Sequence, residues 1–375
     1  MAGIYIHIPF CRQACHYCDF HFSTNLSKQD EMVDAIILEL KEREDYLEEP
    51  VKTIYFGGGT PSLLKEVQLK KIMASLQDHY EIDNEAEITL EANPEDLTLD
   101  QANSIFDNGI NRLSIGIQTF NSEKLNWMNR AHNSNQSISA YENARKVGFK
   151  NISLDLIYAI PDHNRKEWET DLATLSDLEP EHISLYGLTI EDKTVFGKWE
   201  REQKLIEVPE DEAAKQYLFA IDFLTSNGFI QYEVSNFGKA GFSSRHNNAY
   251  WNGVPYLGVG PGAHSFNSTS RRFNMRNNAQ YLRALHKNEP YSETETLSKV
   301  QLVNEKILTQ LRTNQGLLIE EIDQGLLINF MAHHDALIRE MVSQNLVEID
   351  NKHIRLKPHG FLVADEIALR LFFPE

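Results

Sequence analysis

The chain has 375 residues, 41% of them hydrophobic and 24% charged, so it is long enough to bury a large core without a disulfide scaffold. No apolar run approaches the roughly 18 residues that a membrane span needs, and the N-terminus shows no secretory signal, so we expect a soluble, cytoplasmic protein. The net charge of −19 repels nucleic acid, and no nucleic-acid partner is expected.

The first half of the chain alternates short β-branched or aromatic runs with longer helical patterns. Strands are expected over residues 3–8, 52–56, 87–90, 112–117, 152–156 and 182–185. Helices are expected after the start signals Ser27, Ser62 and Thr98, and over residues 135–147 and 165–178. Repeated strand–helix units predict parallel strands joined by right-handed crossovers. The expected fold class is therefore α/β, with a partial (β/α)6 barrel of the TIM type over residues 1–230.

The remaining chain divides into two further regions. Residues 231–297 form a Gly-, Asn- and aromatic-rich extension, and residues 298–375 show three helical patterns, a β-hairpin and a last helix. This order predicts an α+β, winged-helix-like C-terminal domain. Residues 300–375 carry 7 Lys and Arg against 11 Asp and Glu, which favours a packing or partner role over DNA binding. The acidic run 39–49 is interpreted as a solvated helix face.

The three cysteines of the chain lie close together after the first expected strand. Cys11, Cys15 and Cys18 form a C-x3-C-x2-C segment, which indicates one site, and an odd number of thiols favours metal binding over disulfides. Three thiolates can hold three irons of a 4Fe-4S cubane and leave the fourth iron open to another ligand. The spacing leaves open a zinc site, completed by His16, His21 or His7.

Polar or glycine residues also fall near the ends of the other expected strands. The second strand runs into GGGTP, where missing Cβ atoms either let the backbone approach a ligand or only allow a tight turn. Glu91 ends the third strand, where it could bind ribose hydroxyls or cap the next segment, and Gln118 ends the fourth. Asp155 lies inside the apolar fifth strand, where Arg130 could supply a compensating charge. Because active sites of parallel barrels form at the C-terminal ends of strands, we expect one site there.

The order of these motifs resembles that of the radical S-adenosylmethionine (SAM) proteins. YIHIPFC-x3-C-x-YC, GGGTPS, EANP, GINRLSIGIQ, Arg130 and SLDLIYAIP occur as in the branch that contains the oxygen-independent coproporphyrinogen III oxidases and the HemW heme chaperones. The resemblance implies a 4Fe-4S cluster on Cys11, Cys15 and Cys18, with SAM chelating the open iron. It also implies that SAM contacts Tyr5, Tyr17, Gly58, Gly59, Thr60, Glu91, Gln118, Arg130 and Asp155.

Two features separate this chain from the oxidases of the branch. The oxidases carry an additional cysteine two residues after the cluster motif, where this chain has Phe20, and a longer segment before the cluster. The segment RHNNAYW, with His246, Tyr250 and Trp251, resembles the H-N-x-x-Y-W motif of the heme chaperones. Its pattern alone favours a turn-rich core segment, but in the family context a histidine can ligate heme iron while aromatic side chains cover the macrocycle. His264 is a second candidate iron ligand.

The resemblance therefore predicts a chaperone that binds heme and transfers it to an acceptor hemoprotein, with a 4Fe-4S cluster and SAM as cofactors. The alternative is an oxygen-independent coproporphyrinogen III oxidase, in which SAM supplies a radical for oxidative decarboxylation. The sequence leaves open whether SAM is cleaved, whether the acceptor is respiratory and membrane-associated, and whether the chain forms a homodimer around the cluster.

Overall fold

The computed structural model describes residues 2–162, 164–350 and 352–374. Its main feature is one sheet with the strand order β12-β11-β10-β9-β1-β2-β3-β4-β5-β6-β8-β7. The six central strands are parallel, and all six strands that the sequence predicts are confirmed. They are β1 (Ala2–Ile8), β2 (Val51–Gly58), β3 (Ile82–Ala92), β4 (Arg112–Gln118), β5 (Ile152–Tyr158) and β6 (His182–Gly187).

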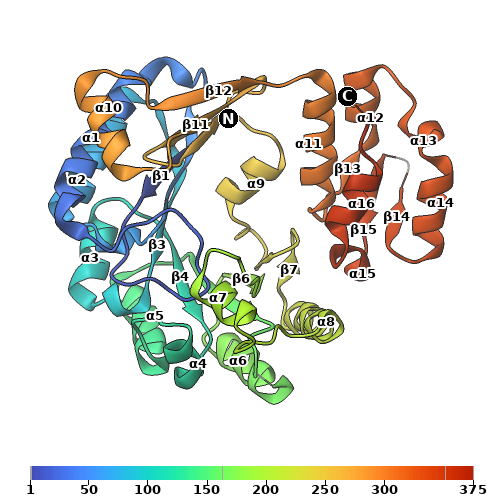
Figure 1. The fold of residues 1–375 in the computed structure, drawn as a ribbon, viewed down its shortest axis with the longest axis horizontal. Helices are drawn as coiled ribbons and strands as arrows, with labels where there is room; N and C mark the ends of the chain where they lie inside the picture. The colour runs from blue at the N-terminus through green and yellow to red at the C-terminus, as the bar shows by residue number, and fades with distance from the viewer. Residues whose placement is uncertain (1, 163, 351, 375) are drawn as a thin grey trace.

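Helices between these strands cover the outer face of the sheet, which curls into an open barrel (Figure 1). They are α1 (Gln29–Glu42), α2 (Glu66–His79), α3 (Leu99–Asp107), α4 (Ser122–Trp127), α5 (Ser134–Val147) and α6 (Arg165–Asp177). Short 3-10 turns lie at η1 (Leu26–Lys28), η2 (Glu44–Tyr46), η3 (Pro61–Leu63) and η4 (Pro94–Asp96). The expected partial (β/α)6 barrel is confirmed.

The predicted helix starts are confirmed at α3 but not at α2. Thr98 caps α3, because its hydroxyl accepts the Gln101 amide at 3.2 Å. The prediction that α2 begins after Ser62 was wrong, since the helix begins at Glu66. The Ser62 hydroxyl is buried and donates to Asp96 Oδ2 (2.8 Å), so it holds two loops together and caps no helix.

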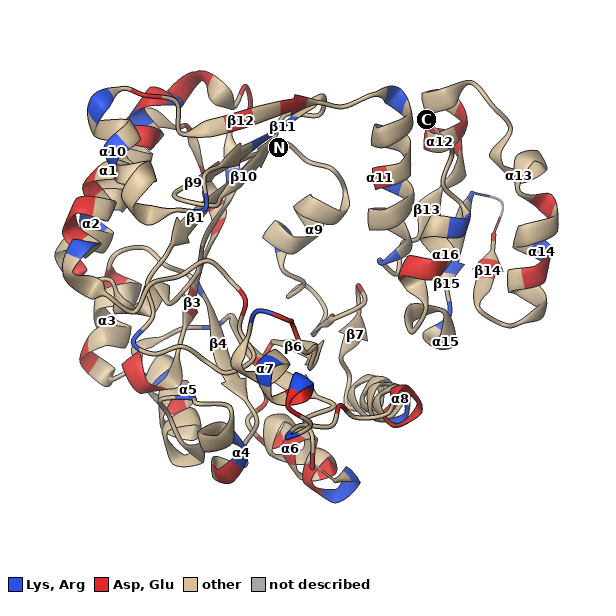
Figure 2. Cartoon of the chain, in the orientation of Figure 1, with Lys and Arg blue, Asp and Glu red and all other residues tan. Residues whose placement is uncertain are grey.

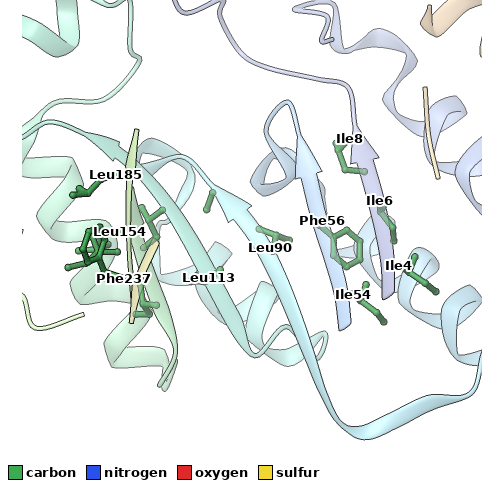
Figure 3. Packing of buried hydrophobic residues seen from close by; sticks show 14 of the residues in the cluster. Ile4, Ile6, Ile8, Ile54, Phe56, Leu90, Leu113, Leu154, Leu185 and Phe237 are labelled. Carbon is green, nitrogen blue, oxygen red and sulfur yellow. The ribbon is translucent and has the colours of Figure 1, made fainter. Parts of the chain in front are cut away.

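The core lies between the sheet and its helices. Alternate residues of the parallel strands point outward and are almost completely buried, as Ile4, Ile6 and Ile8 on β1 and Ile54 and Phe56 on β2 show in Figure 3. Because side chains alternate along a strand, the other half of each strand faces the inside of the barrel. That inner face carries mostly polar side chains.

Residues 231–297, expected as an extension, continue the same sheet at both edges. β8 pairs antiparallel with β6, β9 pairs parallel with β1, and α9 lies on the concave side of the barrel (Figure 1). The elements from the end of the barrel to this point are α7 (Val195–Arg201), α8 (Glu210–Ser226), β7 (Ile230–Gln231), β8 (Asn236–Gly238), α9 (Arg245–Trp251), β9 (Tyr256–Val259), β10 (His264–Phe266), β11 (Ser270–Asn274), α10 (Asn278–Lys287) and β12 (Ser292–Thr296).

The C-terminal region forms a separate α+β unit beside the open side of the barrel (Figure 1). It contains helices and a small sheet in the order β13-β15-β14, and the predicted hairpin is β14–β15. Its elements are α11 (Lys299–Leu311), β13 (Leu317–Leu318), α12 (Ile319–Leu326), α13 (Phe330–His333), α14 (Asp335–Ser343), β14 (Val347–Ile349), β15 (His353–Leu356), α15 (Pro358–Phe361) and α16 (Ala364–Arg370).

The acidic run 39–49 was wrongly interpreted as a fully solvated face. Many Lys, Arg, Asp and Glu residues do lie on the outer helices (Figure 2), but Glu39 is 0% exposed. Its carboxylate accepts the Gly260 amide (2.8 Å) and the Tyr281 hydroxyl (2.6 Å), and it pairs with buried Arg43 (3.3 Å). Arg43 in turn donates to Gly258 O at 3.0 Å. These two residues of the α1 segment therefore fix β9 and the turn that follows it.

Candidate functional site

The three cysteines lie in the loop that follows β1, at the C-terminal ends of the barrel strands. Two backbone hydrogen bonds fix the path of this loop: the Cys11 amide donates to Ser23 O (3.1 Å), and the His16 amide donates to Met128 O (3.0 Å). All three cysteines are free thiols that solvent partly reaches. The three predicted ligands therefore come from one constrained loop at the mouth of the barrel.

Two of the three sulfur atoms accept hydrogen bonds from other segments. Thr60 Oγ1 lies 3.4 Å from Cys11 Sγ, and Arg130 Nη1 lies 3.4 Å from Cys15 Sγ. Burial raises the pKa of Cys11 to about 12 and that of Cys18 to about 11, so their thiolate forms need a bound cation. Hydrogen-bond donors directed at sulfur are typical of iron–sulfur sites, where they tune the cluster. The donor set therefore fits a 4Fe-4S cluster.

The three histidines considered for a zinc site have other partners. His7 Nε2 lies 2.9 Å from His21 O, and His21 Nε2 lies 2.8 Å from Asn278 Oδ1. His16 Nδ1 lies 2.9 Å from Trp127 O. Among the described residues, no three His, Cys, Asp or Glu side chains converge closely enough to bind one metal ion. Each thiolate of a cubane binds a different iron, so the three cysteines can hold a 4Fe-4S cluster without a histidine ligand.

The glycine turn after β2 packs directly against the cysteine loop. The Thr60 amide donates to Phe10 O at 2.7 Å. Gly58 has a φ of +104°, and a Cβ on Gly59 would approach Phe10 O to 2.6 Å. The glycines thus permit a left-handed conformation and a close backbone approach, as the tight-turn alternative requires. The turn also directs the Thr60 hydroxyl at Cys11.

Glu91 and Asp155 face the inside of the barrel from β3 and β5. Tyr55 Oη donates to Glu91 Oε1 (2.8 Å), and Ser114 Oγ donates to Asp155 Oδ2 (3.0 Å). Burial, together with the nearby charge of Asp155, raises the pKa of Glu91 to about 7. Burial also raises the pKa of Asp155, although three serine hydroxyls oppose that shift. The two carboxyl groups therefore lie together in a site where solvent is restricted.

Arg130 joins the cysteine loop to the ends of β3 and β4. Its Nη2 donates to Asn93 Oδ1 (2.8 Å) and to Gly116 O (2.9 Å), while Nη1 donates to Cys15 Sγ. The expectation that Arg130 compensates Asp155 was wrong, because its hydrogen bonds are used at the cysteine loop. Asn93 was missed as a site residue, although it stands inside the EANP motif that carried the resemblance.

The remaining residues predicted to contact SAM line the same end of the barrel. Tyr5 stacks on Tyr55 with ring centroids 6.2 Å apart. Tyr17 lies with its hydroxyl 3.5 Å from Arg130 Nη1. Gln118 ends β4 with a φ of +70°, a conformation that is uncommon for a residue with a side chain and is often found at functional sites. All three residues are partly accessible to solvent.

The segment expected to bind heme lies inside the barrel as α9. His246 is 2% exposed, and both of its ring nitrogens have partners: Thr53 Oγ1 at 2.8 Å from Nδ1 and Tyr250 Oη at 3.0 Å from Nε2. Its ring stacks on Tyr55 with centroids 5.0 Å apart. Burial lowers the pKa of His246 to about 3, so the imidazole is neutral, as an iron ligand requires. Tyr250 has to move before Nε2 can bind a metal.

Trp251 and His264 lie away from His246. Trp251 faces the C-terminal unit, with the Arg312 guanidinium 5.9 Å from the centre of its ring. Its Nε1 is buried and has no hydrogen-bond partner among the described residues. His264 is exposed on β10 and packs edge-on against Phe273, with ring centroids 4.8 Å apart. The structure therefore brings only His246 and Tyr250 of the candidate heme residues together inside the barrel.

Sequence reasoning missed the residues that line the barrel between these two ends. Tyr55 on β2 contacts both Glu91 and His246, and Arg112 on β4 lies beneath them. The signal was present in the strict alternation of segments such as RLSIGIQ and EITLEA, in which every second residue is polar or small. Because the apolar half is the buried core, the polar half had to line the barrel.

No helix in the part of the chain that the structure describes has the length and apolar character needed to cross a bilayer. Similar proteins match this chain over almost its whole length. A profile of the radical SAM superfamily matches residues 5–175, and one of the HemN C-terminal domain matches residues 297–363. A relative from Lactococcus lactis named heme chaperone HemW is 35% identical over 97% of this chain and 95% of its own.

A relative from Bacillus subtilis with the same name is 32% identical over 98% of each chain. Among solved structures, coproporphyrinogen III oxidase (HemN) from Escherichia coli, described as a radical SAM enzyme, superposes with a TM-score of 0.85. The superposition covers 99% of this chain and 90% of the oxidase at 23% sequence identity. At that identity the likeness shows a shared fold.

Proposed function

The chain belongs to the HemW family of radical SAM proteins, and on this basis we propose that it binds heme and transfers it to an acceptor hemoprotein. One observation carries the proposal: His246 stacks on Tyr55, and Tyr55 donates a hydrogen bond to Glu91. The candidate heme ligand His246 and the candidate SAM ligand Glu91 therefore both contact Tyr55. A change at the proposed SAM ligand Glu91 can therefore affect the proposed heme ligand His246 through Tyr55.

A 4Fe-4S cluster and SAM are the cofactors that membership of the radical SAM family implies. In our proposal Cys11, Cys15 and Cys18 hold the cluster, and when bound the two cofactors supply an electron and a source of a carbon-centred radical. Arg130 donates to the Cys15 sulfur and presents a fixed positive charge to the SAM carboxylate. Tyr55 orients the Glu91 carboxyl toward the ribose hydroxyls. The full set proposed to contact SAM is Tyr5, Tyr17, Gly58, Gly59, Thr60, Glu91, Gln118, Arg130 and Asp155.

Heme is the cargo in this proposal, and α9 supplies its ligands. Thr53 fixes the His246 ring through Nδ1, which leaves Nε2 as the nitrogen that binds iron once Tyr250 has moved. Tyr250 would then cover part of the apolar macrocycle, whereas Trp251 would first have to leave its place beside Arg312 of the C-terminal unit to do the same. Because Nε2 is blocked in the structure, heme binding should be accompanied by a rotation of the Tyr250 side chain.

Anaerobic reconstitution tests both sites in one preparation. We expect about four irons and four sulfides per chain, together with a shifted Soret band when heme is added. His246→Ala should lose the heme signal and keep the iron and sulfide, while the control His264→Ala should keep all three. Bound zinc in place of iron and sulfide would contradict the cluster, and undiminished heme binding by His246→Ala would contradict the ligand assignment.

The structure offers no additional residue that supports the oxidase alternative. Phe20, which stands where the oxidases of the branch have a further cysteine, is 68% exposed on the cysteine loop. Coproporphyrinogen III incubated with the reconstituted protein, SAM and a reductant should therefore give no protoporphyrinogen. A respiratory, membrane-associated acceptor and a homodimer around the cluster are further parts of the proposal, which heme transfer to vesicle-bound apoprotein and the solution mass would test.

A further inference from the structure

One inward-facing residue of the barrel has a charge that no other residue pairs. Arg112 begins β4 opposite Thr89 on β3, and its side chain is 2% exposed. Its Nε is buried without a hydrogen-bond partner. No hydrogen bond or ion pair joins its guanidinium to any other residue that the structure describes.

The buried acidic groups on the strands around Arg112 are bound elsewhere, and Glu87 on β3 accepts hydrogen bonds from the Arg245 and His246 amides. Glu91 accepts a hydrogen bond from Tyr55, and Asp155 accepts hydrogen bonds from Ser114 and Ser153. Burial raises the pKa of both carboxyl groups, and the charge of Arg112 only partly opposes this effect. The guanidinium therefore acts on these carboxyl groups from a distance and does not form a contact pair with either.

The other titratable groups that the charge of Arg112 affects include two neutral histidines and two tyrosines, Tyr55 and Tyr232. Burial lowers the pKa of His182 and of His246, and the charge of Arg112 lowers both further. The inward-facing residues of β1–β6 in the described chain include no Lys and no second Arg. Among the inward-facing strand residues that the structure describes, Arg112 is thus a lone permanent cation at the N-terminal end of a polar barrel, and its hydrogen-bond donors remain available.

A buried charge without a counter-ion is strongly unfavourable, so an anionic ligand is the natural explanation of this arrangement. We propose that Arg112 binds a carboxylate of the cargo, a propionate of heme, inside the barrel; this inference rests on the proposed binding of heme by His246. The planar guanidinium can hold a carboxylate through two parallel hydrogen bonds. The residue would thereby select a cargo that carries acidic side chains.

SAM is the other source of a carboxylate, and the position of Arg112 favours heme. Gln118, six residues later on the same strand, lies about 20 Å further toward the cysteine loop. Arg130 already provides a cation at that end. Arg112 lies instead at the level of His246 in the barrel: it pairs with Thr89, Thr89 pairs with Tyr55, and the Tyr55 ring stacks on that of His246. A heme whose iron is bound by His246 would place a propionate within reach of Arg112.

The test compares two hemes on three forms of the protein. Hemin and its dimethyl ester, which lacks both negative charges, are titrated into the wild type, Arg112→Met and Arg112→Lys, with the Soret band as readout. We expect the wild type to prefer hemin, and Arg112→Met to bind hemin about 10- to 100-fold more weakly without a change for the ester. Arg112→Lys keeps the charge, so its affinity for hemin should lie between those of the wild type and Arg112→Met. The melting temperature of Arg112→Met without ligand should stay equal or rise, because an unpaired buried charge is removed.

Each other result overturns the inference. Equal affinity of the wild type for hemin and its ester would overturn it even if the variants do not fold. A loss of SAM binding by Arg112→Met, measured by calorimetry, with hemin binding unchanged would assign the residue to the other carboxylate. A lower melting temperature with unchanged hemin affinity would show a purely structural role. Failure of the wild type to bind either heme would instead contradict the proposed function.

Discussion

At the scale of single residues, buried carboxyl groups make the stability of this protein depend on pH. Burial raises the pKa of Glu91 and of Glu233 to about 7 each, and that of Asp171 to about 6. The folded protein therefore holds these protons more tightly than the unfolded chain does. The stability that this provides is fully present below the unfolded pKa and is lost as the pH rises through the folded pKa.

We expect the free energy of unfolding of the unligated protein to fall as the pH rises from about 4.5 to about 7. Glu91→Gln cannot titrate but keeps an oxygen for the Tyr55 hydroxyl. It should therefore reduce the change in the free energy of unfolding over this pH range by on the order of 1–3 kcal/mol. Urea unfolding at several pH values measures the effect. Glu48→Gln, at an exposed position, is the matched control. An identical slope for Glu91→Gln and the wild type would contradict the assignment.

Site residues were predictable from the sequence only where their role is local. Cys11, Cys15 and Cys18 share one loop. Thr98 caps α3, the helix that begins at the next residue. The partner of Arg130 was not predictable, because Asn93 and Cys15 reach it from segments far apart in the chain. Long-range hydrogen bonds depend on where the fold brings each side chain, and a single sequence does not specify that.

At the scale of elements, α1 does more than cover the sheet. Glu39 and Arg43 extend from the end of this helix into the core and satisfy backbone groups at Gly258 and Gly260. An i, i+4 pair of opposite charges is usually a surface feature of a helix, so the sequence of the acidic run did not predict that Glu39 and Arg43 are buried. The residues that bury the pair come from about 220 positions later in the chain.

Glu39→Ala should destabilise the protein by about 3–5 kcal/mol, because it leaves the Arg43 charge buried without its partner. Glu48→Ala removes an exposed carboxylate from the same acidic run and should change stability by no more than about 0.5 kcal/mol. Urea unfolding of both variants at one pH compares them directly. Similar changes in the free energy of unfolding for the two substitutions would indicate that Glu39, like Glu48, lies on a solvated helix face.

The elements themselves were predictable where their patterns are long. All six parallel strands were found, since each has an alternating or continuous apolar run followed by a helix. The strands β7, β8 and β10 have only two or three residues and carry no periodic signal. β8 forms because the edge strand β6 offers unpaired backbone groups, and β7 and β10 then pair with β8 and β9, a tertiary cause that local patterns do not report.

At the scale of the whole molecule, the C-terminal unit contacts the helix proposed to bind heme. α11 packs beside α9, the Val234 amide donates to Arg312 O (2.8 Å), and the Arg312 guanidinium lies over the Trp251 ring. Arg312 also forms an ion pair with Asp365 on α16. One side chain thus connects α9 to the C-terminal unit, so the two are expected to move together when heme enters.

Arg312→Met keeps most of the packing and removes both the cation–π contact and the ion pair. We expect backbone amides of residues 245–251 to exchange with solvent about 5-fold faster in this variant, which corresponds to about 1 kcal/mol. Hydrogen–deuterium exchange with mass spectrometry measures the change. Arg339→Met, which breaks an exposed pair with Asp335, should leave this segment unaffected. Unchanged exchange in Arg312→Met would mean that the C-terminal unit does not stabilise α9.

The sequence by itself determined the parallel barrel, the cysteine loop and the family, because these depend on hydrophobic periodicity and on motifs whose members are close in the chain. Only the tertiary structure decided that α9 lies inside the barrel, that Glu39 is part of the core and that Arg112 has no counter-ion among the residues the structure describes. Each of these depends on which distant segments meet. The energy of a buried polar group is set by its neighbours in space, so its role becomes visible only when the chain is folded.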